Sequence, residues 1–314
     1  MVLYLIYGKI IIDRLHLPDG RFLPAVLGGG GPQALWGASL WSDSVGFLSR
    51  SGSDLAPQHE HALQRTGADL SGWVRYDDLP TLRGPQLDYD EDENMLGKDG
   101  EPIPIVVENN LWKRLLGRPL TLPPSYRRPS VVHLITEHAD EPMVETALEL
   151  REQGTLFSLE PLIDFHQWQN RDSMLELVRQ VDIVSPDWPS ASGVAGSNDP
   201  RTVVRFWRQF GPHLVAIRHG RHGSYVWGCD DGAWQVPALP TKVIDPTGAG
   251  NSYGGGLCVG WAETRDARMA ACYATVSASF LLEQPGIPEQ PPSLARAEAR
   301  RRLACVFREV QPLQ

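Results

Sequence analysis

The chain has 314 residues and a formal net charge of −9, which suits a single α/β unit and argues against a broad nucleic-acid-binding surface. Its four cysteines lie far apart and form no C-x-x-C pair, so we expect free thiols in a reducing compartment rather than zinc ligands. No stretch reaches the ~18 uninterrupted apolar residues of a membrane span, and no small-residue cleavage site follows the apolar start, so we expect a cytoplasmic protein without membrane binding.

The first 70 residues alternate apolar runs with turn and helix signals. A β-branched run at 2–12 predicts the first strand, and it ends at Asp13. Proline and glycine near the run ends predict turns and a helix start. In chain order the pattern predicts a turn at 18–20, a strand at 22–27, four glycines at 28–31, a helix at 32–40, a strand at 45–48 and a helix at 57–65.

Residues 73–105 have a different character. Short extended pieces are broken by Pro80 and by Gly84-Pro85, and an acidic run follows at 90–94. We interpret this section as edge strands or irregular chain standing off the main body. It predicts a mobile cover.

A regular alternation of strands and helices begins at residue 131. Strand-like runs lie at 131–135, 156–159, 181–184, 214–217 and 224–227, and helical patterns lie at 141–153, 171–180 and 200–210. Short apolar strands separated by amphipathic helices are typical of βαβ units in a mostly parallel sheet. Ligands on such sheets bind beyond the carboxyl ends of the strands.

The most informative stretch is Ile244–Gly256, which reads I-D-P-T-G-A-G-N-S-Y-G-G-G. It follows an extended run at 241–244 and leads into an apolar helix start. The first amides of a helix have no intrahelical partner, and the helix dipole is positive there. Because Gly248 and Gly250 carry no Cβ, a phosphate can approach this main chain closely. The Walker A lysine and the Rossmann glycine order are both absent.

The string from Asp245 onward resembles the second signature of the ribokinase, or PfkB, family of carbohydrate and nucleoside kinases. Three further segments match in the family's order: the start of the chain up to Asp13, the glycine run Gly28–Gly31 and the turn Gly220-x-x-Gly223. The resemblance spans nearly the whole chain, and within the family it is greatest to the maintenance-of-killer-like branch.

This resemblance implies a ribokinase-like three-layer α/β/α fold with a mostly parallel central sheet and a small β lid. We expect one domain, 1–314, with the lid contributed by about 10–27 and 73–105. It implies transfer of the ATP γ-phosphoryl group to a hydroxyl of a sugar, nucleoside or related polyol. The implied cofactors are ATP and Mg²⁺, with a monovalent cation left open, and the implied partner is a small-molecule substrate, with a homodimer through the lids left open.

The resemblance also implies roles for particular residues. The segment 276–286 would lie by the adenine, and Trp73 has a position suited to stacking on a sugar or base. The transferring phosphate would lie on Gly248, Ala249 and Gly250, beside Asn251. The substrate would lie on Asp13, Gly28, Gly29, Gly30 and Trp73, the nucleotide on Asp245, Thr247, Arg218, Gly220, Gly223 and Ser279, and Mg²⁺ on Glu160 and Asp187.

Four functional positions depart from the family pattern. Asn251 stands where the family has the aspartate base, and an amide accepts a hydrogen bond but takes up no proton at pH 7. Trp188 stands where the family has a glutamate that helps organise magnesium. Pro32-Gln33 replaces the usual asparagine of the first signature, and in the nucleotide turn Arg218 stands where a threonine is common. Several altered positions indicate natural divergence rather than one engineered change.

Two functions from different classes remain open on the sequence. A general base is typically worth ~10²–10⁴-fold in rate, whereas phosphoryl transfer depends mainly on positioning and charge. The retained Asp13, Asp245 and glycine turn favour a kinase, slow because of Asn251. Asn251 and Trp188 favour the alternative, a catalytically inactive protein that binds a nucleotide or sugar. Arg218 would either contact a phosphate or pair with a nearby carboxylate.

Overall fold

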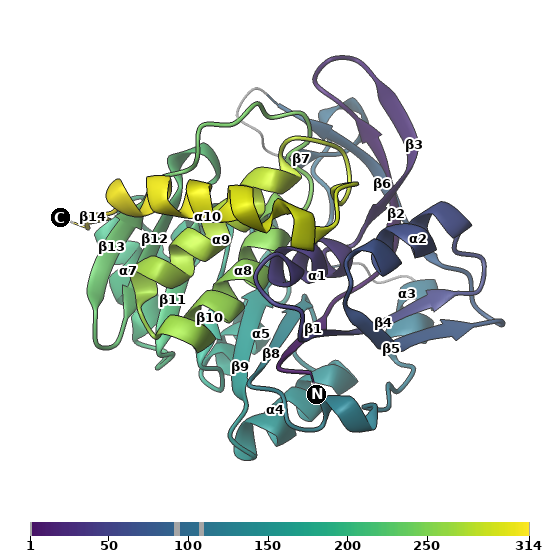
Figure 1. Cartoon of the computed structure of the whole chain (residues 1–314), viewed down its shortest axis with the longest axis horizontal. Helices are drawn as coiled ribbons and strands as arrows, with labels where there is room; N and C mark the ends of the chain where they lie inside the picture. The colour runs from purple at the N-terminus through teal and green to yellow at the C-terminus, as the bar shows by residue number, and fades with distance from the viewer. Residues whose placement is uncertain (1, 91–94, 107–109, 314) are drawn as a thin grey trace.

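The computed structural model describes residues 2–90, 95–106 and 110–313. The described residues form a ten-stranded sheet in the order β14-β13-β12-β11-β10-β9-β8-β1-β4-β5 (Figure 1). Every pairing from β11 to β5 is parallel, and the edge from β11 to β14 is antiparallel. The strands are β1 (Tyr4–Tyr7), β4 (Val45–Gly52), β5 (Asp69–Tyr76), β8 (Val131–Thr136), β9 (Leu156–Pro161), β10 (Ile183–Val184), β11 (Leu214–Arg218), β12 (Ser224–Gly228), β13 (Gly232–Val236) and β14 (Gln311–Pro312).

Helices cover both faces of this sheet. Side chains alternate along a strand, so Leu5 and Tyr7 of β1 enter one apolar cluster while Tyr4 and Ile6 enter the other. The first face is covered by α4 (Pro142–Glu152), α5 (Arg171–Val178), α6 (Trp188–Ala195) and α7 (Pro200–Arg208), and the second by α1 (Gly31–Ser39), α2 (Pro57–Arg65), α8 (Ala249–Thr264), α9 (Ala267–Leu281) and α10 (Pro292–Arg308). The expected three-layer fold with a mostly parallel sheet is confirmed.

A separate four-stranded sheet stands beside this body, in the order β3-β2-β6-β7 (Figure 1). Its strands are β2 (Ile11–His16), β3 (Phe22–Gly28), β6 (Leu82–Tyr89) and β7 (Met95–Leu96). Leu15, Leu17 and Leu87 form a small buried cluster on it, and Ile244 packs against that cluster. The small sheet therefore lies directly on the chain that leads into the glycine turn. Helix α3 (Asn110–Leu116) packs with Ile11 and Leu82 below it.

Three elements differ from the sequence predictions. The apolar run 2–12 is two strands, because the chain leaves the large sheet after Tyr7, where Gly8 packs on Gly31: a Cβ on Gly8 would lie 2.5 Å from Gly31 Cα. Residues 73–76 are no part of a cover, because β5 pairs in parallel with β4 in the large sheet. Residues 91–94 of the expected cover lie outside the described residues.

The third difference precedes the glycine turn. Residues 241–244 form no strand, because their backbone bonds to a helix end: the amides of Ile244 and Asp245 both donate to Leu282 O, at 2.7 and 3.3 Å. Strands β13 and β14 and helices α3 and α6 are among the short elements that were not predicted. The three 3₁₀ turns are η1 (Lys98–Gly100), η2 (Pro124–Tyr126) and η3 (Gly220–His222).

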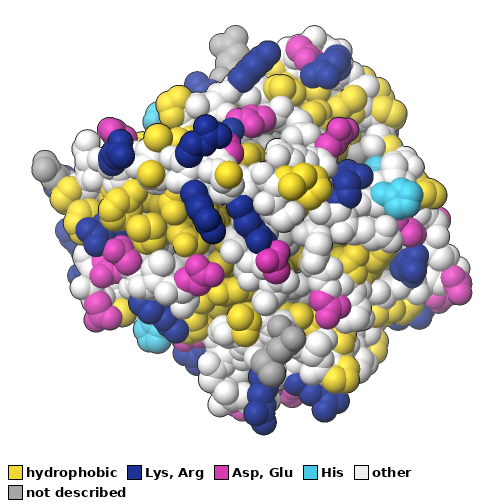
Figure 2. All heavy atoms as spheres, in the orientation of Figure 1, with side chains coloured by type: hydrophobic (Ala, Val, Ile, Leu, Met, Phe, Trp, Pro, Cys, Tyr) yellow, Lys and Arg dark blue, Asp and Glu magenta, His cyan; other side chains and the backbone are white. Residues whose placement is uncertain are grey.

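Charged side chains of both signs share the face shown in Figure 2. On α10, Arg296 pairs with Asp43 at 2.7 Å, and Arg302 pairs with Glu283 and Glu298 at 2.8 and 3.0 Å. Carboxylates thus match these two arginines of the helix. No helix among the described residues has the length and apolar character needed to cross a membrane.

Candidate active site at the start of helix α8

The glycine turn begins helix α8. Gly248 is its N-cap, with φ 77° and ψ 0°, a left-handed conformation that costs a residue with a Cβ about 1–2 kcal/mol. A Cβ at Gly248 would also lie 2.4 Å from Gln33 Cγ. The first i→i−4 bond of the helix runs from Ser252 N to Gly248 O (3.0 Å), so the amides of Gly250 and Asn251 precede the helical ladder. This end of a 16-residue helix has the geometry and the dipole of an anion-binding site.

A buried aspartate braces the chain before the turn. Asp245 Oδ1 accepts hydrogen bonds from Thr247 N and Oγ1, at 2.9 and 2.5 Å. The Tyr89 hydroxyl of the small sheet lies 2.7 Å from Thr247 Oγ1. Burial raises the pKa of both Asp245 and Tyr89. Tyr89 therefore joins the small sheet to the glycine turn as a neutral hydroxyl, a contact that the sequence did not mark.

Asn251 lies in a polar cluster with Glu160 and Arg218. Asn251 Nδ2 donates to Glu160 Oε1 at 2.8 Å, and Arg218 Nη1 donates to the same oxygen at 2.6 Å. Glu160 is 1% exposed, and burial raises its pKa against the lowering effect of Arg218. The guanidinium also lies over the glycine turn, since a Cβ on Gly250 would be 2.4 Å from Arg218 Nη1. Both alternatives for Arg218 thus meet here: it pairs with a carboxylate and it borders the anion-binding amides.

The glycine loop of the predicted substrate site faces the same helix end. Gly29 and Gly30 have φ values of 91° and 82°, which favour glycine. A Cβ on Gly30 would lie 3.0 Å from Asn251 Nδ2, so this loop contacts the first turn of α8. The structure thus brings the two signature segments together.

Asp13 lies between two glycines at an irregularity of strand β2. A Cβ on Gly28 would lie 1.8 Å from Asp13 Oδ2, and a Cβ on Gly84 would lie 2.2 Å from Oδ1. Burial, and secondarily the nearby Asp245 charge, raise the pKa of Asp13 to about 7, while the Gly29 amide opposes them. The carboxyl group thus occupies space that is open only because Gly28 and Gly84 have no side chains. Gly84 was not marked as a site residue by the sequence.

The predicted nucleotide turn follows Arg218. Gly223 has φ 84°, and a Cβ there would lie 2.1 Å from Val236 O. Ser224 joins this turn to α8, because its Oγ accepts a hydrogen bond from the Tyr253 hydroxyl at 2.9 Å. Next to it, Trp188 stacks on His219 with ring centroids 4.2 Å apart. Burial, followed by the His222 charge, lowers the pKa of His219 to about 4, so this ring is neutral at pH 7.

Two predicted site residues have their contacts elsewhere. The Trp73 indole donates to Ser51 Oγ at 2.9 Å, and Arg75 lies 5.0 Å from its ring centroid. Ser279 Oγ donates to Val276 O within α9 and accepts from Arg302 of α10. None of these contacts is with the glycine turn or Asp13. Residue spacing did not reveal that packing between elements uses both side chains.

The acidic residues expected to hold magnesium have protein partners. Glu160 Oε1 is shared by Arg218 and Asn251, and Oε2 faces the interior, 3.9 Å from His133 Nε2. Asp187 caps helix α6 by accepting from Ser190 N at 3.1 Å. The described residues contain no group of three or more His, Cys, Asp or Glu placed to hold a metal ion. This donor set does not fit a magnesium ion bound directly by the protein.

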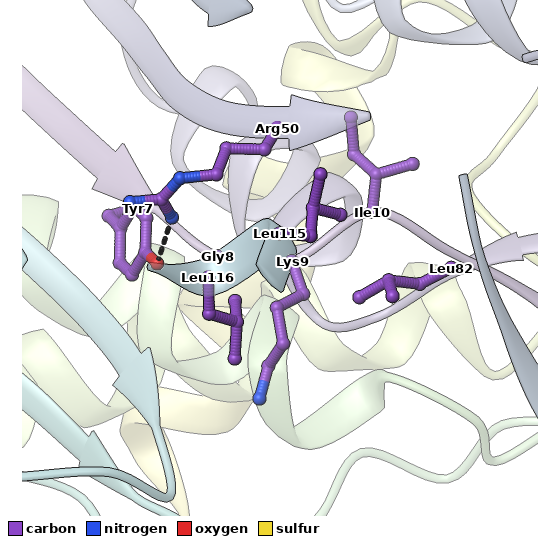
Figure 3. A pocket seen from close by; sticks show the side chains of 8 residues that line it. All are labelled: Tyr7, Gly8, Lys9, Ile10, Arg50, Leu82, Leu115 and Leu116. Atoms are coloured by element: carbon purple, nitrogen blue, oxygen red, sulfur yellow. Dashed lines mark hydrogen bonds between the residues drawn. The ribbon is translucent and has the colours of Figure 1, made fainter. Parts of the chain in front are cut away.

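A second buried charge cluster lies behind the glycine loop, around a small cavity (Figure 3). Arg50 donates to the Tyr7 hydroxyl at 2.7 Å, while Lys9 extends in another direction and pairs with Glu137. Lys9 O also accepts a hydrogen bond from Gly31 N at 3.2 Å. The sequence marked none of these charged residues, although a lysine inside an apolar run was a usable signal.

Known proteins resemble this chain over most of its length. A cytidine kinase from Thermococcus kodakarensis is 27% identical over 268 residues, which cover 83% of this chain and 88% of that protein. An aminoimidazole riboside kinase from Salmonella enterica, solved with aminoimidazole riboside and an ATP analogue, has a TM-score of 0.68 at 18% identity and covers 96% of this chain. The ribokinase of Thermotoga maritima gives 0.66 at 18% identity and covers 97%. At these identities the two structures show the shared ribokinase-like fold.

A family model described as pfkB family carbohydrate kinase matches residues 128–293. The matched segment is more than half of the chain and includes Glu160, Arg218 and the whole glycine turn. It begins before β8 and ends at the start of α10, so it contains strands β8 to β13 of the large sheet and the anion-binding helix α8. The chain therefore belongs to the pfkB family of carbohydrate kinases.

Proposed function

We propose that this chain is an ATP-dependent phosphotransferase that acts, slowly, on a hydroxyl group of a nucleoside or sugar. One observation carries the proposal: the first turn of α8 meets the glycine loop, with Asn251 Nδ2 3.0 Å from the Cβ position of Gly30. A site that only binds an anion needs no neighbouring substrate loop. A phosphoryl-transfer site needs both an anion-binding turn and a substrate loop, because the donor phosphate and the acceptor hydroxyl must be in contact.

In the proposed reaction, the acceptor oxygen forms a bond to the γ-phosphorus of ATP and the bond to ADP breaks. The Gly250 and Asn251 amides would stabilise charge on the transferring group. Asn251 Nδ2 is held by Glu160, so its Oδ1 is the atom left to accept a hydrogen bond from the acceptor hydroxyl. The amide orients that hydroxyl but removes no proton, and the proton leaves to solvent or to the phosphate. Turnover is therefore slow.

The proposed substrate class is a nucleoside, with sugars as the second class. The relative from Thermococcus kodakarensis is named a cytidine kinase, and a relative from Methanothermobacter thermautotrophicus, 26% identical over 48% of this chain, is named a nucleoside kinase. Asp13 is the proposed acceptor for a substrate hydroxyl. Its buried carboxyl group lies between Gly28 and Gly84 and loses little entropy on binding.

The experiment is an ADP-release assay of the purified chain against cytidine, other nucleosides and a panel of sugars, in parallel with product detection by mass spectrometry. We expect a phosphorylated nucleoside whose formation stops in Asp13→Asn. Arms with and without K⁺ test the monovalent cation. ATP binding without any phosphorylated product would instead support the inactive binding protein, which two observations favour: Asn251 is neutral, and Trp188 occupies its stack with His219.

A further inference from the structure

Arg218 places a cation beside the anion-binding amides of α8. It ends strand β11, and its backbone is fixed because Arg218 N donates to Pro186 O at 3.1 Å. Its side chain is 12% exposed and extends between Glu160 and Gly250. Arg218 Nε is buried and has no hydrogen-bond partner among the described residues. A buried N–H group without a hydrogen-bond acceptor destabilises the fold unless a ligand supplies that acceptor.

Asn251 changes the net charge of the side chains around Arg218, compared with an aspartate at the same position. Glu160 contributes −1, Arg218 contributes +1 and Asn251 contributes 0, so the three side chains are neutral together. An aspartate at position 251 would make the sum −1, and an incoming phosphate would be repelled unless a metal ion offset it. The asparagine removes that requirement. Asp187, the other acidic residue expected to hold such a metal, uses its Oδ1 in the α6 cap, and it lies close enough to Glu160 that burial and the Asp187 charge together raise the pKa of the Glu160 carboxyl group.

We infer that Arg218, fixed by Glu160, is a built-in cation that binds the terminal phosphate at the Gly248–Gly250 turn and makes nucleotide binding largely independent of Mg²⁺. The inference rests on the proposed function and identifies the residue that supplies the positive charge of its nucleotide site. Arg suits this role because its planar donors bind a carboxylate on one side and a phosphate on another. Partial burial strengthens the attraction, since little water screens it.

The test is calorimetric binding of ATP and of inorganic tripolyphosphate, each in excess Mg²⁺ and in excess EDTA. Removing Arg218 alone would leave the Glu160 carboxylate buried without its cation, so the comparison is Glu160→Gln against Glu160→Gln/Arg218→Met. We expect the loss of the guanidinium to weaken both probes at least ~10-fold in EDTA, the amount a charge-assisted hydrogen bond provides. EDTA alone should weaken binding to the wild type by less. Arg205→Met, on the exposed side of α7, is the charge-matched control and should bind as the wild type does.

Three results would overturn the inference. Wild-type binding that disappears in EDTA would show that a metal ion supplies the charge. Unchanged binding on loss of Arg218 would show that the amides suffice, and tighter binding would show that the guanidinium blocks the turn. Each of these leaves the phosphotransferase proposal standing. Tripolyphosphate binding that depends on Arg218, without any ATP binding, would keep Arg218 as a phosphate-binding cation but would contradict both its role toward a nucleotide and the phosphotransferase.

Discussion

Asn251 and Glu160 are joined by a hydrogen bond of 2.8 Å from the amide Nδ2 to the carboxylate Oε1. The same oxygen accepts from Arg218, so the negative charge near the start of α8 sits on Glu160 rather than on residue 251. The bond also fixes the orientation of the Asn251 amide. The pair thus separates two tasks that one aspartate would combine: Glu160 carries the charge, and Asn251 presents a neutral acceptor.

A carboxylate at position 251 should restore little activity by itself. Asn251→Asp would place two carboxylates in contact through Glu160 Oε1, and one of them would take up a proton at neutral pH. The charge-swapped double variant Asn251→Asp/Glu160→Gln keeps the shape and net charge, and its glutamine can donate to the new carboxylate. We expect the double variant to gain up to the ~10²–10⁴-fold of a general base, and the single variant to gain much less below pH 8. Steady-state kcat measures both.

Glu160→Gln alone is the control for that comparison. It keeps Asn251, so it should show no gain in kcat. Equal gains in the single and double variants would contradict the idea that Glu160 and a carboxylate at 251 share one proton.

Gly248 should tolerate no side chain. Gly248→Ala combines a left-handed φ of 77° with a contact of 2.4 Å to Gln33 Cγ. We expect a loss of stability of roughly 2 kcal/mol or more, together with loss of nucleotide binding. Gly196→Ala is the matched control, because Gly196 has φ 62° and nothing within 4 Å of a new Cβ. It should cost about 1 kcal/mol in urea unfolding and leave ATP affinity unchanged.

The position of Asp13 should depend on Gly84. A Cβ at Gly84 would lie 2.2 Å from Asp13 Oδ1, and since the Gly84 backbone is unstrained, the main conflict is with that carboxyl group; the next residue, Ile11, lies 3.3 Å away at Cγ2. We expect Gly84→Ala to raise KM for the acceptor substrate at least ~10-fold with little change in ATP affinity. Gly20→Ala, in the turn between β2 and β3, has nothing near its Cβ and adopts a φ of 86°, so it strains the small sheet away from Asp13 and controls for a loss of stability there. An unchanged KM would mean that Asp13 does not contact the substrate.

The strand and helix pattern after residue 131 was predictable because local signals and tertiary structure agree there. Strands β8, β9, β11 and β12 and helix α4 lie within a few residues of the predicted spans, since each apolar run is buried in one layer. The glycine turn was predictable for the same reason: φ and close approach both require Gly248. Residues 241–244 were not, because an extended backbone looks alike whether it bonds to a sheet or to a helix end.

Much of the site could not be predicted from the sequence because it depends on contacts between residues that are far apart along the chain. The Asn251–Glu160 bond joins residues 91 apart, and the Tyr89–Thr247 contact joins residues 158 apart. Gly84 acts only through a carboxyl group on another strand. The aromatic character of Trp73 suggested stacking on a substrate, but it gave no sign of the contacts that the pairing of β5 with β4 gives this side chain.

Asp13 should make folding less favourable as pH rises. Its pKa is about 7 in the folded chain against a usual value of 3.8, so the unfolded chain loses this proton first. The contribution to stability is fully present below pH 4 and is lost as pH rises through 7. We expect Asp13→Asn to match the wild type near pH 4 and to be more stable by up to roughly 4 kcal/mol at pH 8. Urea unfolding at several pH values measures the difference.

The exposed Asp172 provides the control for that series, since its side chain is 84% exposed. Asp172→Asn should show no such divergence from the wild type between pH 4 and pH 8. A wild type as stable as Asp13→Asn at pH 8 would contradict a raised pKa at this carboxyl group.

Neutralising only one member of the Lys9–Glu137 pair should destabilise the fold more than neutralising both. Both side chains are nearly inaccessible, at 6% and 1% exposure, and Lys9 Nζ lies 5.3 Å from the Trp112 ring centroid. Lys9→Met would leave the Glu137 carboxylate buried without its cation, which costs about 3–5 kcal/mol. Lys9→Met/Glu137→Gln removes both charges, and we expect it to recover at least half of that loss in urea unfolding. Arg171→Met breaks the exposed Arg171–Asp172 pair and should cost less than ~1 kcal/mol. A double variant as unstable as Lys9→Met would show that the lysine acts through packing on Trp112 rather than through its charge.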